Sequence, residues 1–201
     1  MANADSPFGL IPLRYVSGAP YNGAANPYYV SDATNALGVG SVVSLVGTAV
    51  NGVPQVQRAT VDDTTPANNT PIVGVIVGIV DDEDGTVDRD NSRYIAGGAT
   101  GYALVADDPN LLFKMQEDGD LDNAGVGAHY NIEFGTFDTV YGIAKDEIDS
   151  STLDATDTGN VQNLQVLRLH SNPNNAVDTK AVWECMIVNH ALRPGGPVTS
   201  I

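Results

Sequence analysis

Short apolar segments alternate with clusters of Gly, Asn and Asp along most of this chain. The segment 40–50 is followed by Asn51-Gly52 and then by the segment 53–60. Because both Asn and Gly accept a positive φ angle, this arrangement predicts a tight β-hairpin. Residues 72–80 (IVGVIVGIV) are β-branched and apolar at almost every position, which predicts a buried strand. Gly74 and Gly78 within it predict a bulge or a close backbone approach.

The same pattern predicts further strands at 93–95, 101–106, 112–116, 129–134, 139–144, 161–170 and 181–189. Helical signals are confined to short turns at 108–110 and 121–128, with another turn expected at 172–179. Polar loops are expected at 62–70 and 145–160. Short strands at this spacing predict an all-β fold, a compact antiparallel barrel or sandwich with an extended N-terminal arm.

The first 30 residues have a composition of their own. Residues 7–29 hold four of the 11 prolines and five of the 13 aromatic residues. Proline lacks a ladder donor, so we expect neither a helix nor a central strand there, and tyrosine is favoured at interfaces. We therefore predict an arm at 1–30 that lies over its own domain or a neighbour, followed by a single β-rich domain at 31–201. The candidate interface residues are Pro7, Phe8, Leu10, Ile11, Tyr15, Tyr21, Tyr28 and Tyr29.

An alternative reading of the same segment is an ordinary N-terminal stretch packed on its own β domain. The charge distribution bears on this choice. The chain has 9 Lys and Arg against 25 Asp and Glu, a formal net charge of −16, yet residues 1–60 are neutral overall. We expect the acidic part to face solvent and the neutral part to suit contact with another protein, although short windows also vary in charge by chance.

The acidic balance also restricts the classes of partner. Nucleic acids and anionic membranes attract cations, so neither is an expected partner. The longest apolar segment, 72–80, has nine residues and is too short to span a membrane, and no secretory signal opens the sequence.

Candidate catalytic and metal-binding groups are few. Cys185 is the single cysteine, and its place in AVWECMIV predicts a small buried hydrophobic residue on a strand. The three histidines are far apart, and no P-loop, dinucleotide-binding glycine triplet or nucleophile elbow is present. We therefore expect no enzyme activity, no catalytic residue and no cofactor.

The acidic run Asp81-Asp82-Glu83-Asp84-Gly85 is the one weak metal candidate. In an EF-hand loop the glycine is the sixth position, which would place Val80 first, where it cannot bind calcium. A solvated hairpin loop is the expected structure. A looser calcium site with Asp81, Asp82 and Asp84 remains an alternative.

Three segments resemble a known family. They are the opening ANADSPFGLIPLRYVSGAPYNGAANPYYV, the middle GYALVADDPNLLFKMQED and the end LQVLRLHSNPNNAVDTKAVWECMIVNHAL. Together they resemble the capsid decoration (cement) proteins of tailed bacteriophages. The resemblance implies a protein made in the host bacterial cytoplasm and bound to the outer surface of the virion capsid. The implied partners are the major capsid protein and further copies of the chain, as a homotrimer that braces neighbouring capsomers.

Two other functions stay open at this point. One is a tail, head-fibre or vertex component that binds a receptor or a glycan. The other is a calcium-binding β module or a carboxylate-based enzyme centred on residues 81–90.

Overall fold

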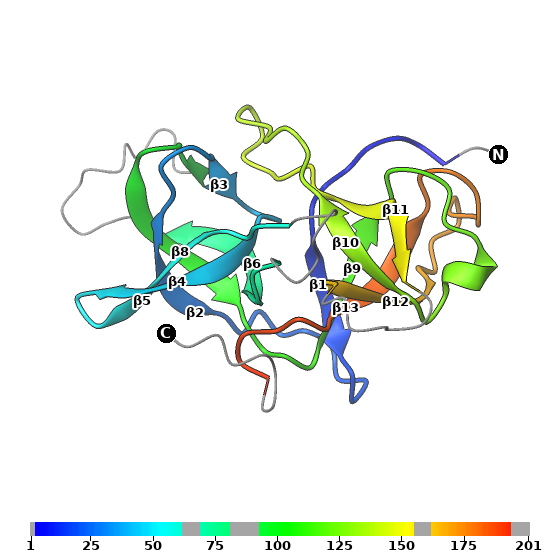
Figure 1. Ribbon diagram of the computed structural model, residues 1–201, viewed down its shortest axis with the longest axis horizontal. Helices are drawn as coiled ribbons and strands as arrows, with labels where there is room; N and C mark the ends of the chain where they lie inside the picture. The colour runs from blue at the N-terminus through cyan, green and yellow to red at the C-terminus, as the bar shows by residue number, and fades with distance from the viewer. Residues whose placement is uncertain (1–2, 62–68, 81–92, 155–161, 194–201) are drawn as a thin grey trace.

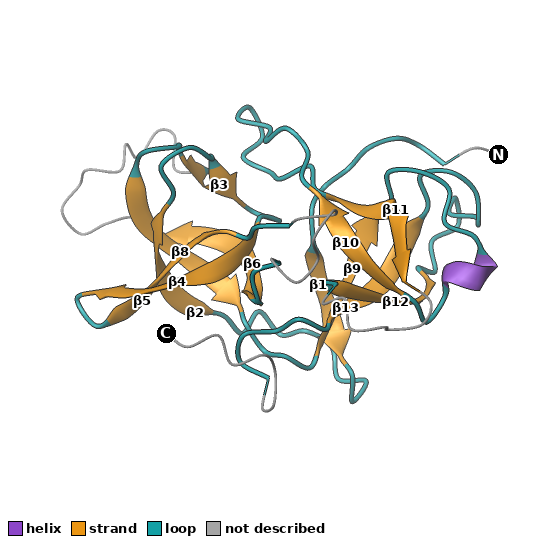
Figure 2. Cartoon of the chain, in the orientation of Figure 1, coloured by secondary structure: helices purple, strands orange, loops and turns teal. Residues whose placement is uncertain are grey.

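The strands form two lobes that lie side by side (Figure 1). The computed structural model describes residues 3–61, 69–80, 93–154 and 162–193. The strands are β1 (Ile11–Tyr15), β2 (Asn26–Ser31), β3 (Leu37–Gly38), β4 (Val42–Val50), β5 (Val53–Arg58), β6 (Ile72–Val80), β7 (Tyr94–Ile95), β8 (Thr100–Ala106), β9 (Leu111–Gln116), β10 (His129–Glu133), β11 (Glu147–Asp154), β12 (Leu164–Leu169) and β13 (Val182–Ile187). Figure 2 shows the single helical turn among the described residues, the 3₁₀ turn η2 (Asn123–Gly125). The all-β prediction is confirmed.

The first lobe is a closed barrel in the order β2-β5-β4-β6-β8. Its core is apolar: Tyr28, Val30, Leu37, Val43, Val56, Val73, Ile76, Ile95, Ala103 and Val105. The predicted hairpin is confirmed as β4 and β5, and Asn51 and Gly52 have φ angles of 51° and 81°. Strand β6 is also confirmed, with a bulge between Ile76 and Gly78. Gly74 is the predicted close approach, since an added Cβ would lie 2.2 Å from the Ala106 carbonyl oxygen.

The second lobe is a six-stranded sheet in the order β1-β9-β13-β12-β10-β11. A parallel bridge between Glu117 and Ile148 brings β11 back to the end of β9, so the sheet curls around its core. That core holds the largest fully buried side chains of the lobe, Trp183, Tyr130 and Phe113.

The two lobes share buried contacts. Val42, Ile72 and Val75 belong to barrel strands, yet they pack in the same cluster as the core of the sheet. In addition, the Ile72 backbone N–H donates to the Asn189 carbonyl oxygen at 2.8 Å, and Ile72 accepts from the Ala191 N–H at 2.8 Å. The lobes are therefore packed as one body.

The N-terminal segment is built into both lobes, which corrects the prediction of a separate arm. Strand β1 pairs with β9 at the edge of the sheet, and β2 lies between β5 and β8 in the barrel. The predicted boundary at residue 30 falls inside β2. The prolines are compatible with these two strands. Pro12 lies beside a bulge in an edge strand, and Pro27 comes before Tyr29, the first residue of β2 that pairs with β5.

Two local predictions are wrong. Residues 139–144 form a turn and not a strand, and the expected loop at 145–160 contains β11. The pattern of apolar and polar residues does not predict β11, because its polar residues are partly buried and bonded to one another. The Asp149 carboxylate, for example, accepts from the Ser151 N–H at 2.9 Å. No helix in the described residues is long and apolar enough to cross a membrane.

Candidate interaction surface

The eight predicted interface residues do not form one exposed surface. Leu10 and Tyr28 are 1% and 6% exposed, so both belong to the chain's own core and their prediction as contact residues is wrong. The Tyr28 hydroxyl donates to Asp107 at 2.7 Å. The other six are half-buried: Pro7, Phe8, Ile11, Tyr15, Tyr21 and Tyr29.

These half-buried side chains contact neighbours within the chain. Tyr15 and Tyr21 pack against the core of the sheet lobe. The Tyr29 ring meets the edge of the Tyr102 ring at 5.3 Å between centroids, and the Phe8 ring lies 5.5 Å from the Lys114 ammonium. In this segment the aromatic residues thus serve mainly intramolecular packing.

The most exposed large apolar side chains lie elsewhere, on the loop at 134–146 between β10 and β11. Val140 and Tyr141 are 71% and 68% exposed, more than any other large apolar residue described. Figure 1 shows this loop, in yellow-green, projecting beside the junction of the two lobes. Adjacent exposed apolar residues on a projecting loop are typical of a contact surface.

The tip of this loop has a defined internal structure. The Asp138 carboxylate accepts the backbone N–H groups of Val140 at 3.0 Å and Tyr141 at 3.1 Å. The Tyr141 N–H and the Lys145 ammonium, 3.1 Å away, hold the pKa of Asp138 below its usual value. Gly142 closes the turn with a φ angle of 71°. The turn therefore fixes the direction in which Val140 and Tyr141 are presented.

Two arginines of the barrel lobe fasten the loop to that lobe. Arg58 donates to the Gly135 carbonyl oxygen at 3.3 Å and to Asp146 at 2.8 Å, and its guanidinium lies 4.4 Å from the centre of the Phe134 ring. Arg93 donates to the Val140 carbonyl oxygen at 3.1 Å. The loop is thus attached to the barrel along its length.

Backbone contacts reinforce this attachment. Val39 forms a parallel bridge with Ile143 and accepts the Ala144 N–H at 2.9 Å. Gly38 is needed here because an added Cβ would come within 2.6 Å of the Gly142 carbonyl oxygen. A loop that begins and ends in the sheet lobe and is bonded to the barrel loses little conformational freedom on binding a partner.

The Arg58–Asp146 pair is buried, with Asp146 1% exposed. Burial raises the pKa of Asp146 to about 6, although Arg58 opposes this shift. Removal of one partner would leave the other without its counter-charge in a poorly solvated place. The pair therefore links the fold of the loop to the fold of the barrel.

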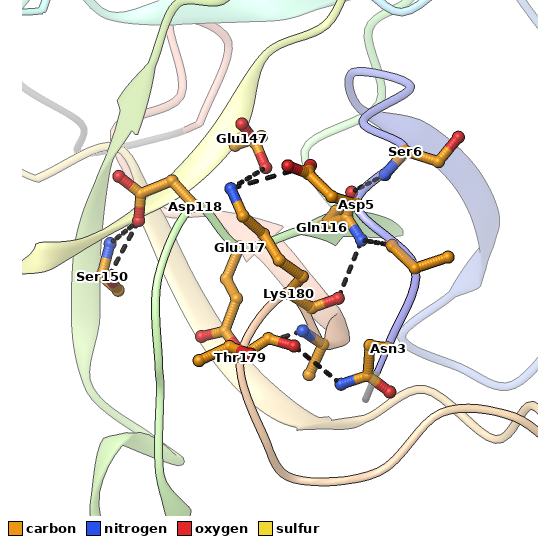
Figure 3. A network of polar contacts seen from close by, with 12 residues as sticks. Asn3, Asp5, Ser6, Gln116, Glu117, Asp118, Glu147, Ser150, Thr179 and Lys180 are labelled. Carbon is orange, nitrogen blue, oxygen red and sulfur yellow. Dashed lines mark hydrogen bonds and ion pairs between the residues drawn. The ribbon is translucent and has the colours of Figure 1, made fainter. Parts of the chain in front are cut away.

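A second polar network ties the N-terminus to the sheet lobe (Figure 3). The Asn3 amide donates to the Thr179 carbonyl oxygen at 3.1 Å, and Gln116 donates to the Ala4 and Lys180 carbonyl oxygens at 2.7 and 2.8 Å. The Lys180 ammonium lies 3.4 Å from Glu147. These contacts hold residues 3–6 against the end of β9.

Glu117 is fully buried beside this network. Its carboxylate accepts the N–H groups of Ala181, at 3.0 Å, and Leu121. Burial nevertheless raises its pKa to about 7. Both of its oxygens accept main-chain N–H groups. Glu117 therefore joins the end of β9 to Ala181, the residue before β13, and has a structural role.

Cys185 and His190 are both buried inside the fold. Cys185 is buried on β13 as predicted, and burial raises the pKa of its thiol. His190 is 1% exposed, and burial lowers the pKa of its imidazole to about 4. Among the described residues, no group of three His, Cys, Asp or Glu side chains is placed to hold a metal ion. Asp81, Asp82 and Asp84 lie outside the described residues.

The apolar pattern at 139–144 predicts a strand, so it does not reveal the projecting loop. Asp138 and Gly142 bound the turn that overlaps that segment and are turn signals that indicate it.

No protein-family model matches this chain, and no curated protein matches it.

Proposed function

We propose that this chain is a non-enzymatic structural protein of a bacteriophage virion, which binds the outside of the capsid and joins neighbouring capsomers. The major capsid protein is the proposed partner, and several copies of the chain act together. The resemblance of the three sequence segments suggests this class of protein.

One structural observation carries the proposal: Val140 and Tyr141 are exposed on a loop that connects β10 and β11 of the sheet lobe and is bonded to the barrel by Arg58 and Arg93. A cement protein needs a pre-ordered contact, because each copy must bind without a large cost in conformational entropy. Tyrosine is also enriched at the centres of interfaces. Repetition over a shell then multiplies a modest contact through avidity.

A tail or vertex component that binds a receptor or a glycan is the second candidate, and the same exposed loop favours it. The two functions differ in the number of copies per virion. Quantitative mass spectrometry of virions would find about one copy per major capsid subunit for a cement protein and a few copies per particle for a vertex component. A virion without the chain would contradict both.

The first prediction concerns the loop. Val140→Ser and Tyr141→Ser should each weaken binding to shells that lack this protein by about tenfold, because each removes an apolar contact worth about 1.4 kcal/mol or more. Co-sedimentation with shells measures the loss. Val177→Ser is the matched control, since Val177 is also exposed but lies in the sheet lobe before β13. Equal affinity for all three variants would remove the loop from the proposed interface.

A further inference from the structure

A row of charged side chains crosses four strands of the sheet lobe. Lys114 on β9 and Arg168 on β12 are each paired in register with Glu184 on the strand between them, β13. Arg14, on β1, is bonded to the Glu184 carboxylate, and the Arg168 Nε lies 3.3 Å from it. His170 approaches the same carboxylate, with Nδ1 3.4 Å from Oε1.

This row is cationic in a strongly acidic chain. It contains three of the 9 Lys and Arg residues of a protein with a net charge of −16. One carboxylate, that of Glu184, faces three permanent positive charges, so the row has a net charge of +2 before any protonation of His170. We call these five residues the cationic row.

The charges of the cationic row are not fully neutralised within the chain. The Arg168 side chain is 60% exposed, while that of Glu184 is 10% exposed. The Lys114 ammonium lies over the Phe8 ring, and no ion pair joins it to a carboxylate of the described residues, although Glu184 is its neighbour in the sheet. The row therefore lacks at least one anionic partner, which a second molecule can supply.

A complementary group exists on the chain itself. Asp118, Asp120 and Asp122 follow β9 and lead into η2, and Asp120 and Asp122 are exposed. Figure 2 shows η2, in purple, at the end of the sheet lobe that points away from the barrel, whereas β1 lies next to the barrel. The β1 end of the cationic row is thus far from the acidic turn, and among the described residues no ion pair joins Asp120 or Asp122 to the row.

We propose that the cationic row binds the acidic turn Asp118–Asp122 of a second copy of this chain. The charges argue for this occupant, since the protein's own surface is rich in the carboxylates that the row lacks. Such a contact is head-to-tail, because different surfaces of the two copies meet. It is independent of the proposed capsid binding and concerns the chain in solution.

The test is a charge exchange measured by sedimentation equilibrium of the full chain. Arg168→Glu and Asp120→Lys should each weaken self-association by roughly tenfold or more, since each places like charges opposite one another. The double variant should regain the wild-type dissociation constant, because the pair is restored with its signs reversed. Arg193→Glu is the control: it changes the net charge by the same amount as Arg168→Glu, but Arg193 lies outside the cationic row, so self-association should weaken less.

The exchange also separates the contact from a folding defect, because a misfolded Arg168→Glu chain would not be rescued by Asp120→Lys. Salt alone does not discriminate, since it screens both this contact and the repulsion between acidic copies. A wild-type chain that stays monomeric, or a double variant no better than either single one, would overturn the proposal. Loss of shell binding without any change in self-association would instead assign the row to the capsid.

Discussion

The barrel and the six-stranded sheet are filled with different chemistry. The barrel core consists of aliphatic side chains and Tyr28, and the segment 33–57, which supplies Leu37, Val43 and Val56, has no charged residue. The sheet lobe instead buries Glu117, Asn131 and Glu184 beside its apolar residues. The barrel also buries Asp32, Ser41 and Ser44, but its packed core cluster is apolar, whereas the sheet lobe places polar groups beside its core, where each needs a partner.

This difference has a consequence for stability. An apolar core responds to volume changes and is indifferent to pH, while buried carboxyl groups link folding to proton binding. The junction combines both kinds, since Arg58 of the barrel meets Asp146 of the sheet lobe.

The largest effect is expected at the junction. Arg58→Ala should lower the free energy of unfolding by about 3–5 kcal/mol, because it leaves the Asp146 carboxyl group buried without its partner. Denaturation in urea, followed by fluorescence of Trp183, measures this loss. Both lobes should unfold together, since they share one buried cluster.

A double variant sharpens this result. Arg58→Met with Asp146→Leu replaces the pair by apolar side chains and should recover most of the loss, since no buried charge remains. If Arg58→Ala costs less than about 1 kcal/mol, the pair does not join the lobes and the loop at 134–146 is held by its backbone contacts alone.

A smaller effect is expected in the barrel. Gly52→Ala should cost about 1–2 kcal/mol, because an L side chain disfavours the positive φ angle at the hairpin turn. Gly47 has a φ angle of 79° in the same hairpin, so Gly47→Ala is a matched comparison. Chemical denaturation at fixed pH measures both, and an unchanged stability would show that the hairpin tip adjusts without cost.

The barrel was the more predictable lobe from sequence. The Asn51-Gly52 turn and the apolar segment 72–80 carry local signals, and both elements formed where expected. In the sheet lobe, β11 was missed because Ile148 is its fully buried apolar residue while Asp149 and Ser151 bond to one another. Other polar contacts of β11 come from distant segments, as where Asp118 accepts the Ser150 N–H at 2.9 Å, and no local pattern reveals those.

The candidate surface was less predictable for a related reason. Leu10 and Tyr28 have the composition of an interface, yet they are buried in the chain's own core. Val140 and Tyr141 look like strand residues, yet an Asp138 turn exposes them. The composition of a segment indicates that its side chains are buried. Only the tertiary structure decides whether they are buried in the chain's own core or against a partner.

The smallest predicted effect concerns pH and the sheet lobe. Burial raises the pKa of Glu117 from 4.5 to about 7, so between these values the folded state binds more protons than the unfolded one. Stability from this group is therefore present below about pH 4.5 and is lost as the pH rises through about 7. Between pH 6 and 8 the free energy of unfolding should fall by about 1 kcal/mol.

Urea denaturation at pH 6, 7 and 8 measures this slope, and Glu117→Gln should flatten it even though the variant is less stable throughout. The variant is less stable because both carboxylate oxygens of Glu117 accept main-chain N–H groups. The NH₂ of a Gln side chain would face one of these two N–H groups, donor against donor.

His190 and Asp146 act over part of the same range. The pKa of His190 is lowered from 6.5 to about 4, so its contribution to stability rises as the pH increases through about 6.5, while that of Asp146, with its pKa raised to about 6, falls. These two contributions oppose one another, so the difference in slope between the unmodified chain and Glu117→Gln reports Glu117. Equal slopes from pH 6 to 8 in the unmodified chain and in Glu117→Gln would mean that Glu117 is ionised in the folded state, and that its two main-chain partners outweigh its burial.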